Sequence, residues 1–174
     1  MDGKITIPKI FGHIAQVLIH KFWVFVYCCK FGIVWRGIKH DISKFSYTEF
    51  WDSVRYYHRG SSPIPRLHEH KKYRPWLHHK GRNDHHSEYW HRYSHGTVFA
   101  LKMPFDCVLE QVADWLGSTR AYGRNFDFDE ELQWLRETTF YTFHKDTLDL
   151  TMKIIKGLKS GNLDLKALRK AYES

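Results

Sequence analysis

The chain of 174 residues is predicted to be an all-α protein, folded as one compact helical domain. Three observations support this class. Apolar residues recur at the three- and four-residue spacing of an amphipathic helix in several segments. No segment sustains the strict alternation of apolar and polar residues that a half-buried strand requires. Residues that favour helix ends stand at the boundaries of the periodic segments, and a hydrophobic content of 43% suffices for a core at this length.

The first predicted helix runs from Ile10 to about Cys29. Within it, Ile14, Val17 and Leu18 lie on one face, and the aromatic residues of its second half indicate burial on nearly all sides. The apolar run in that half is much shorter than the span of a bilayer, and it starts too late for a signal peptide. We therefore expect a buried helix in a protein that does not enter a membrane.

Gly32 is expected to end the first helix, because glycine weakens helical structure. A second helix is predicted over residues 33–42. Ser43 or Ser46 is expected to begin a third helix, and Ser46 has Glu49 three residues later, which is the spacing of a capping box. This third helix would end before the Gly-Ser-Ser-Pro run that follows it.

Residues 60–84 are predicted to form a long loop. Proline and glycine recur along them, with Pro75 and Gly81 in the second half, and both residue types discourage long regular structure. A loop of this length in a small domain is typically functional or disordered. Trp76 and Leu77 favour docking of the loop onto the body of the protein.

After this loop the sequence predicts only helices. A short helix is expected near residues 86–93, and Pro104 suits the first turn of a longer helix over residues 105–122. Asp127 or Asp129 is expected to cap the next helix. That helix would pass through Leu132, Leu135, Phe140 and Phe143. Two more helices are predicted after it, one over residues 146–158 and a short one over residues 163–172.

The net charge is +8 with neutral histidines, which favours anionic partners such as nucleotides, nucleic acid or other phosphorylated substrates. A generally basic surface explains the same charge equally well, because Lys and Arg are spread along the chain. The three cysteines, Cys28, Cys29 and Cys107, are expected to be reduced thiols, since adjacent cysteines rarely form a structural disulfide. A cytoplasmic location is therefore expected.

Histidine is the most unusual feature of the composition, with 13 residues in the chain and a cluster of them between positions 68 and 95. Imidazole nitrogen and carboxylate oxygen together suit borderline and hard divalent metal ions. His40 and Asp41 are adjacent, and Glu110 and Asp114 are four residues apart, so their carboxylates project from one helical face. A solvated acidic pair would have the same spacing. Asp114 is the favoured ligand of the two, because apolar residues directly after it place its turn against the core.

Four separate segments therefore offer ligands to one metal centre. The predicted ligands are His20, His40, Asp41, His79, His85, His86 and Asp114. They would hold one or two divalent ions of Mn, Fe, Co, Mg or Zn, because the spacing of the ligands is compatible with a mononuclear and with a dinuclear centre. A helical core over residues 10–125 would carry the centre. Residues 126–174 offer no ligand candidate and would pack as a helical buttress or supply a homo-oligomer contact.

The order of His20, the adjacent pair His40–Asp41 and the distant Asp114 resembles the ligand pattern of the HD superfamily of metal-dependent phosphohydrolases. The segment His40-Asp41-Ile42-Ser43-Lys44 is similar to the HD-x-G-K form of that motif, with serine in place of glycine. His85-His86-Ser87-Glu88 is similar to the additional His-His-Glu element of members that hold more than one metal, with one extra residue. This resemblance implies a helical bundle of the HD type, here with a long histidine-rich loop.

The stretch from His20 to Trp115 resembles more closely an uncharacterised family that is common in phages and bacteria. Its members share an HD-x-SKF-x-x-x-EF block, a WLHHKGRN-x-HH-x-EYW block and an E-x-x-x-DW helix. The matching stretches here are His40–Phe50, Trp76–Trp90 and Glu110–Trp115. The resemblance implies the cytoplasm of a bacterial or phage-infected cell, and it implies no established activity.

The residues and the resemblance together predict a metal-dependent phosphohydrolase that acts on a nucleotide or a related phosphoester. A bound divalent ion would lower the pKa of water and so provide a nucleophile. The predicted catalytic residues are Lys44, His79, Arg82 and His86, which would offset phosphate charge or transfer protons. The predicted substrate-binding residues are Lys80, Arg82, Asn83 and Trp90, although packing explains an aromatic residue equally well.

Two other functions remain open from the sequence. A minority of HD-type proteins use two irons and dioxygen, and the many histidines are compatible with such an oxygenase. A basic nucleic-acid-binding protein with structural histidines is a third alternative, supported by the charge and by the basic and aromatic residues between 68 and 92. No Cys-x-x-Cys site and no recognised nucleic-acid-binding motif supports this third alternative.

Overall fold

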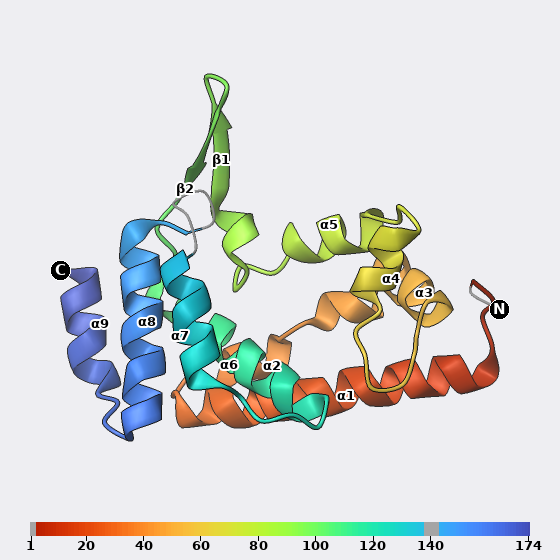
Figure 1. The fold of residues 1–174 in the computed structure, drawn as a ribbon, viewed down its shortest axis with the longest axis horizontal. Coiled ribbons are helices and arrows are strands. Elements are labelled where there is room, and N and C mark those ends of the chain that lie inside the picture. Colours follow the sequence, from red (N-terminus) through yellow and green to blue (C-terminus); the bar gives the residue numbers. More distant parts are fainter. Residues whose placement is uncertain (1–2, 138–142) are drawn as a thin grey trace.

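The structure is a computed structural model that describes residues 3–137 and 143–174. Within these residues it contains nine α-helices, two short 3-10 helices and one β-hairpin, so the all-α prediction is confirmed. Figure 1 shows α1 along one side of the molecule, with α3, α4 and α5 over its N-terminal half. The elements are α1 (Ile7–Lys30), α2 (Val34–Lys39), η1 (Ile42–Phe45), α3 (Tyr47–Arg55), α4 (Ile64–Glu69), α5 (Arg74–Lys80), η2 (Ser87–Trp90), β1 (His91–Ser94), β2 (Thr97–Ala100), α6 (Phe105–Ala121), α7 (Phe128–Glu137), α8 (Lys145–Ser160) and α9 (Leu165–Glu173).

Helices α1 and α6 form the centre of the fold. A Cβ atom at Gly117 of α6 would lie 2.8 Å from the backbone nitrogen of Val24, closer than real atoms approach. The missing side chain at Gly117 therefore lets α6 lie directly against α1. The inner face of α1 is largely apolar but also buries two histidines, and its buried residues are His13, Val17, His20, Val24 and Cys28. Polar groups are thus held inside the core where α1 and α6 pack together.

The segment after α1 differs from its prediction. Gly32 ends the helix with a positive φ of 76°, as expected. The helix predicted over residues 33–42 is shorter, because α2 ends at Lys39. His40 then takes an extended ψ of 128°, and Asp41 takes a left-handed φ of 52°. The His-Asp pair therefore stands in a sharp turn between α2 and η1 and does not belong to the helix.

Two predictions for residues 43–84 have different outcomes. Ser46 caps α3 as predicted, because its Oγ accepts a hydrogen bond from the backbone nitrogen of Glu49 at 3.3 Å. The long loop predicted over residues 60–84 is wrong, since it contains α4 and α5. Pro65 and Pro75 lie in the first turns of these helices, where proline needs no backbone donor. Both prolines therefore begin helices that they were expected to prevent.

The segment around residues 86–100 also departs from the prediction. The short helix expected there is the 3-10 turn η2, and it is followed by strands β1 and β2 in an antiparallel hairpin. His95 and Gly96 connect the strands with φ of 49° and 78°, and positive φ at both central residues is what a tight hairpin turn requires. The hairpin projects from the helical body (Figure 1). The expectation of no strand was wrong for these residues.

The C-terminal helices pack on α6 near one end of α1 (Figure 1). Asp127 caps α7, since its Oδ1 accepts hydrogen bonds from the backbone nitrogens of Asp129 and Glu130 at 2.9 and 3.0 Å. Phe140, which was predicted in the same helix, lies outside the described residues. One apolar cluster joins Val24 of α1 to Ile154 of α8. The C-terminal helices therefore share a continuous core with the helices that carry the histidines.

Helix α1 has an apolar outer face as well. Among the described residues it is the one helix long and apolar enough to cross a membrane by length and composition, with mean hydropathy 1.3. Phe11, Leu18 and Phe22 are 68%, 53% and 57% exposed on this face. The opposite face packs on α6 and carries His13 and His20. Core helices of globular proteins have the same length and composition, so the absence of a membrane segment stays a prediction.

Candidate metal centre

The first group of metal-ligating side chains lies between α1, the His-Asp turn and α6. His20, His40, Asp41 and Asp114 are all buried and bring one ligand atom each within 4.8 Å of the others. Nε2 of His20 lies 3.2 Å from Oδ1 of Asp114 and 3.3 Å from Oδ2 of Asp41. Nε2 of His40 lies 3.5 and 3.3 Å from the same two oxygens. Two imidazoles thus face two carboxylates.

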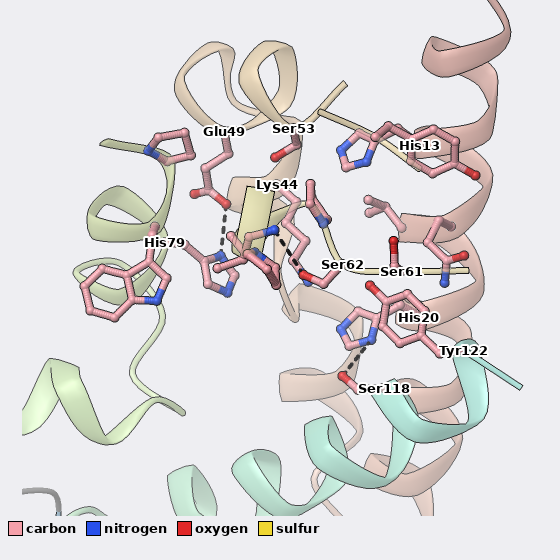
Figure 2. Close-up of a pocket in the computed structure, with 18 of the residues that line it drawn as sticks. His13, His20, Lys44, Glu49, Ser53, Ser61, Ser62, His79, Ser118 and Tyr122 are labelled. Atoms are coloured by element: carbon pink, nitrogen blue, oxygen red, sulfur yellow. Dashed lines mark hydrogen bonds and ion pairs between the residues drawn. The ribbon is translucent and has the colours of Figure 1, made fainter. Parts of the chain in front are cut away.

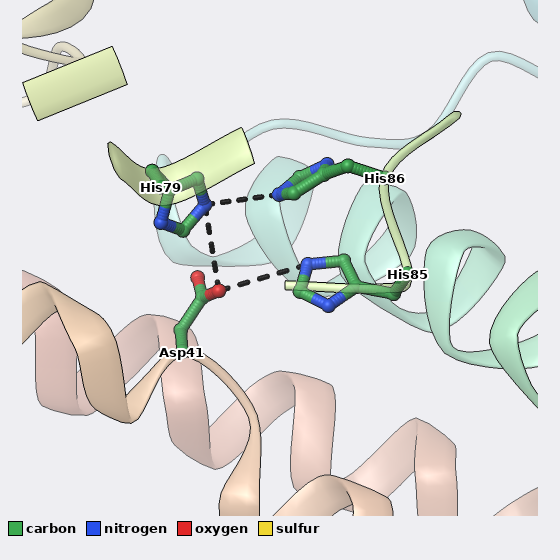
Figure 3. Close-up of side chains that lie close together, drawn as sticks. All are labelled: Asp41, His79, His85 and His86. Atoms are coloured by element: carbon green, nitrogen blue, oxygen red, sulfur yellow. Dashed lines mark hydrogen bonds and ion pairs between the residues drawn. The ribbon is translucent and has the colours of Figure 1, made fainter. Parts of the chain in front are cut away.

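The second group lies on the other side of Asp41 and comes from α5 and the loop before η2. Its members are Asp41, His79, His85 and His86, and Figure 3 shows the three rings turned toward one another and toward the carboxylate. Oδ1 of Asp41 lies 3.5 Å from Nε2 of His79 and 3.6 Å from Nε2 of His85. Nε2 of His86 lies 2.9 Å from Nε2 of His79.

Asp41 belongs to both groups. Its Oδ2 faces the first group and its Oδ1 faces the second. The left-handed backbone at Asp41 directs the carboxylate inward, and aspartate tolerates this conformation better than most residues. Lys44, one 3-10 turn later, places Nζ 2.6 Å from Oδ2. One carboxylate is therefore positioned to bridge two sites beside a cation.

The donor atoms of the centre fit a metal ion. Among the described residues, Oδ1 of Asp41 and Nε2 of His85 are buried without a hydrogen-bond partner, and unpaired buried polar atoms are rare in proteins. Imidazole nitrogen and carboxylate oxygen are the donors that divalent transition metals take. The residues predicted as metal ligands therefore all gather into buried clusters that could bind a metal ion.

The carboxylates of the centre are held in their ionised form. Burial alone would raise the pKa of a carboxyl group. At Asp41, the charges of His40 and Lys44 outweigh burial and hold the pKa well below its usual range. At Asp114, burial is likewise outweighed by His20 and His40, and the pKa is again lowered. Both groups are thus anionic near neutral pH, as metal ligands must be.

Glu110 orients one histidine of each group. Its Oε1 accepts a hydrogen bond from Nδ1 of His40 at 2.8 Å and lies 3.1 Å from Nδ1 of His85. Arg36 donates from Nε to Oε2 of Glu110 at 2.5 Å and pairs with Asp84 through its other nitrogens. Hydrogen bonds at Nδ1 turn Nε2 of both rings toward the ligand groups, which is the usual task of outer-shell carboxylates.

Glu49 does the same for His79 from α3. Its two oxygens accept hydrogen bonds from Nδ1 of His78 at 2.6 Å and from Nδ1 of His79 at 2.9 Å. On the other side of the centre, Oγ of Ser118 lies 3.4 Å from Nδ1 of His20. The sequence offered no reason to place Arg36 or His78 at the centre, and its spacing predicted Glu49 only as part of a helix cap. A buried glutamate paired with histidines has no fixed sequence spacing, so only the fold could reveal it.

His86 differs from the other histidines of the centre. Burial first, then His85 and Lys80, lowers the pKa of His86 well below its usual value. A neutral imidazole can bind a metal or accept a proton, whereas it is a poor acid. Nζ of Lys80 lies 3.0 Å from Nδ1 of His86 and 3.2 Å from Glu88. A metal ion at Nε2 of His86 would make Nδ1 a donor, so Lys80 would then pair with Glu88 alone.

A cavity of about 450 Å³ opens from the centre toward the N-terminal half of α1 (Figure 2). The predicted residues Lys44, His79, Lys80 and His86 line it, together with His20 and Asp114. The structure does not bring Arg82 or Trp90 to this cavity. Arg82 is exposed and lines a second depression of about 310 Å³, which is also lined by His40, Asp41 and His85 of the centre. Trp90 packs against the apolar core and donates from Nε1 to the carbonyl of Asp84 at 2.7 Å.

Asn83 also lies away from the cavity and joins two segments of the centre. Its Nδ2 donates to Oγ of Ser43 and to the backbone carbonyl of His79, both at 2.8 Å. These bonds tie the loop after α5 to η1, next to Lys44. Asn83 therefore ties together the segments that carry the predicted ligands, and it lines the same depression as Arg82, so its substrate contact stays a prediction.

The fold and the two ligand groups define an all-α protein with a buried histidine–carboxylate centre that could hold metal ions. A model of a family of unknown function, DUF5662, matches residues 9–157, and the chain belongs to this family. The match includes every residue of both ligand groups. Neither the curated proteins nor the solved structures contain a match to the chain.

Proposed function

We propose that the protein is a metal-dependent phosphohydrolase that acts on a nucleotide or a related phosphoester. The observation that carries the proposal is the pair of ligand groups that share Asp41 and border a cavity of about 450 Å³. His20 and Asp114 of the first group and His79 and His86 of the second all line the cavity. A substrate in the cavity would therefore touch both groups.

His20, His40, Asp41 and Asp114 would hold one divalent ion, and Asp41, His79, His85 and His86 would hold a second. Such ions supply activation of water and stabilisation of the charge that develops on a phosphoryl group. Imidazoles outnumber carboxylates in this donor set, which favours Mn, Fe, Co or Zn over Mg, because Mg prefers oxygen donors.

The chain itself would supply positive charge and a neutral imidazole. Lys44 stands beside Asp41 at the cavity wall, and burial of its ammonium is outweighed by Asp41 and Asp114, so its pKa is raised and it stays cationic. Lys80 adds a second cation to the lining of the cavity. Preorganised cations of this kind stabilise phosphate charge in a site that excludes water. The lowered pKa of His86 keeps its imidazole neutral, which suits a metal ligand better than a proton acceptor.

The experiment is elemental analysis of the purified protein combined with a phosphate-release screen of nucleotides and phosphoesters. Asp41→Asn should lose both metals and all phosphate release, because both groups depend on this carboxylate. Asp129→Asn, an exposed aspartate of α7, is the matched control and should keep both. Full metal content in Asp41→Asn would contradict the shared centre. A metal-replete wild-type protein that releases phosphate from no substrate would contradict the hydrolase.

A di-iron oxygenase of the HD type is the second candidate. The observation that favours it is the donor set, in which five imidazoles accompany two carboxylates, because imidazole suits iron well. The same preparation distinguishes the two functions. Tightly bound iron pairs with a visible absorption band and consumption of dioxygen would support the oxygenase, whereas activity restored to apo-protein by manganese or cobalt under nitrogen would support the hydrolase.

A further inference from the structure

The cavity continues well beyond the metal centre, along the inner face of α1. His20 and His13 are seven residues apart on this helix and both line the cavity. Seven residues correspond to about 10 Å along a helix axis. Figure 2 shows the two rings at two levels of α1, both extending from the same side of the helix. A ligand with its phosphate at the centre and its other end at His13 would have to be much longer than phosphate itself.

The walls of this extension are mainly apolar. The apolar residues that line it are Val17, Pro63, Ile64, Pro65, Pro75 and Trp76. The charged side chains that line the cavity all contact the metal centre instead. These are Asp114, Lys44 beside Asp41, Lys80 beside His86 and Glu49 beside His79. The ligand is therefore expected to carry its charge at the centre and an uncharged, largely apolar group at the other end.

His13 is the exception in these apolar surroundings. Its side chain is 5% exposed, and its Nε2 has no hydrogen-bond partner among the described residues. The rings of Phe50 and Tyr57 lie 5.5 and 6.1 Å from it. Burial and, secondly, Lys44 lower the pKa of His13 to about 4, so the ring is neutral at physiological pH. A buried polar atom without a partner is costly unless a ligand supplies one.

Several other polar groups along the cavity already have protein partners. Gln16 donates to the carbonyl of Ala121, Ser61 contacts Arg66 and Ser62 accepts from the backbone of Ile64. A group that carries hydroxyls on every side would therefore need more partners than the mainly apolar walls of the extension offer. A purely hydrocarbon chain would leave Nε2 of His13 unpaired. A flat heterocycle, apolar on its faces and polar at its edge, satisfies both conditions.

We propose that this extension binds the heterocyclic base of a nucleoside phosphoester, and that Nε2 of His13 bonds the polar edge of that base and so selects the substrate. The assignment rests on the proposed phosphohydrolase for the position of the phosphate. The base lies among Trp76, Pro75 and Ile64, and the phosphate meets Lys44 and the ligand groups. A volume of about 450 Å³ is within the range of sites that bind ligands of this size.

The first experiment compares kcat/KM for the four nucleoside 5′-monophosphates with kcat/KM for glycerol phosphate. The wild-type protein should prefer at least one nucleotide, and His13→Phe should lower this preference by about 10- to 100-fold, the effect of losing one buried hydrogen bond. His13→Gln, which keeps a donor and an acceptor, should recover part of it. His70→Phe, an exposed histidine outside the cavity, is the matched control and should keep the preference.

The second experiment separates the cavity from the reaction. The four nucleosides without phosphate are titrated calorimetrically into wild type, His13→Phe and His13→Gln, each confirmed as folded by circular dichroism. If wild type binds a nucleoside and His13→Phe binds it about 10-fold or more weakly, the inference is supported. If no phosphoester is hydrolysed in addition, only the proposed hydrolase is overturned. Hydrolysis without base preference and without nucleoside binding overturns the inference and leaves the hydrolase in place. Absence of both overturns both.

Discussion

Replacing Glu110 by glutamine should weaken metal binding at both ligand groups although Glu110 is a member of neither. In the wild type, one oxygen of Glu110 faces Nδ1 of His40 at 2.8 Å and Nδ1 of His85 at 3.1 Å, and the other accepts from Arg36. A glutamine side chain has one acceptor oxygen, and its amide nitrogen would meet a second donor. The substitution keeps the size of the side chain and removes its charge.

The size of the effect follows from the contacts. Loss of an outer carboxylate that holds a metal-ligating histidine costs about 10- to 100-fold in metal affinity, or about 1.4–2.7 kcal/mol per site. Because Glu110 contacts one histidine of the first group and one of the second, the loss should occur at both sites. Arg36 keeps its contacts with Asp84, so the fold should survive the change.

The assay is calorimetric titration of apo-protein with manganese or zinc in the presence of a competing chelator. Glu130→Gln on the exposed side of α7 is the matched control and should bind both ions as wild type does. Urea unfolding of each apo-protein checks that the fold is intact. Unchanged affinity at both sites in Glu110→Gln would refute the orienting role. A loss at one site alone would refute the reasoning that this carboxylate serves both groups.

Three further outcomes are expected. His20→Ala should remove one bound metal and leave the second, measured by elemental analysis, because His20 belongs to the first group alone. Gly117→Ala should lower the free energy of unfolding in urea by about 1–3 kcal/mol, since its Cβ would lie 2.8 Å from the backbone of Val24. For His13, the unfolded pKa of 6.5 falls to about 4 on folding, so the unfolded state binds more protons between these values. The contribution of neutral His13 to the free energy of unfolding should therefore be fully present above pH 6.5 and should fall by about 3 kcal/mol toward pH 4. Urea unfolding of His13→Phe should lack this pH-dependent contribution.

The sequence predicted the parts of the fold that depend on local chemistry. Ser46 and Asp127 cap helices where their side chains suggested, and Gly32 ends α1. The failures came from proline and from short strands. Pro75 begins α5 although proline was taken to oppose helices there, because its effect depends on whether it falls in a first turn or later. The hairpin strands contain four residues each, too few for alternation to be recognised.

For the centre, residue type and order were sufficient to select the histidines and aspartates that lie together in the two ligand groups. They were insufficient to select the residues that hydrogen-bond to those histidines. His40 and Asp41 stand out because they are adjacent. Arg82 and Asn83 stand between the ligand histidines His79 and His85 in the sequence, yet Arg82 is exposed and Asn83 bonds Ser43. Proximity along the chain does not decide on which side of a turn a side chain lies, since successive residues in a loop point in different directions.

Glu110 and Asp114 illustrate this limit most clearly. Their spacing indicated that both carboxylates share a face of α6. In the structure both approach the ring of His40, each at a different nitrogen atom. Asp114 approaches Nε2 of His40 at 3.5 Å, and Glu110 accepts from Nδ1 at 2.8 Å. Four residues advance a helix by about 6 Å, which is enough to carry a carboxylate from one nitrogen edge of an imidazole to the other. A pair of acids at this spacing on a helix beside a buried histidine can therefore supply a metal ligand and the group that orients the histidine, and the choice between them depends on where the ring lies along the helix.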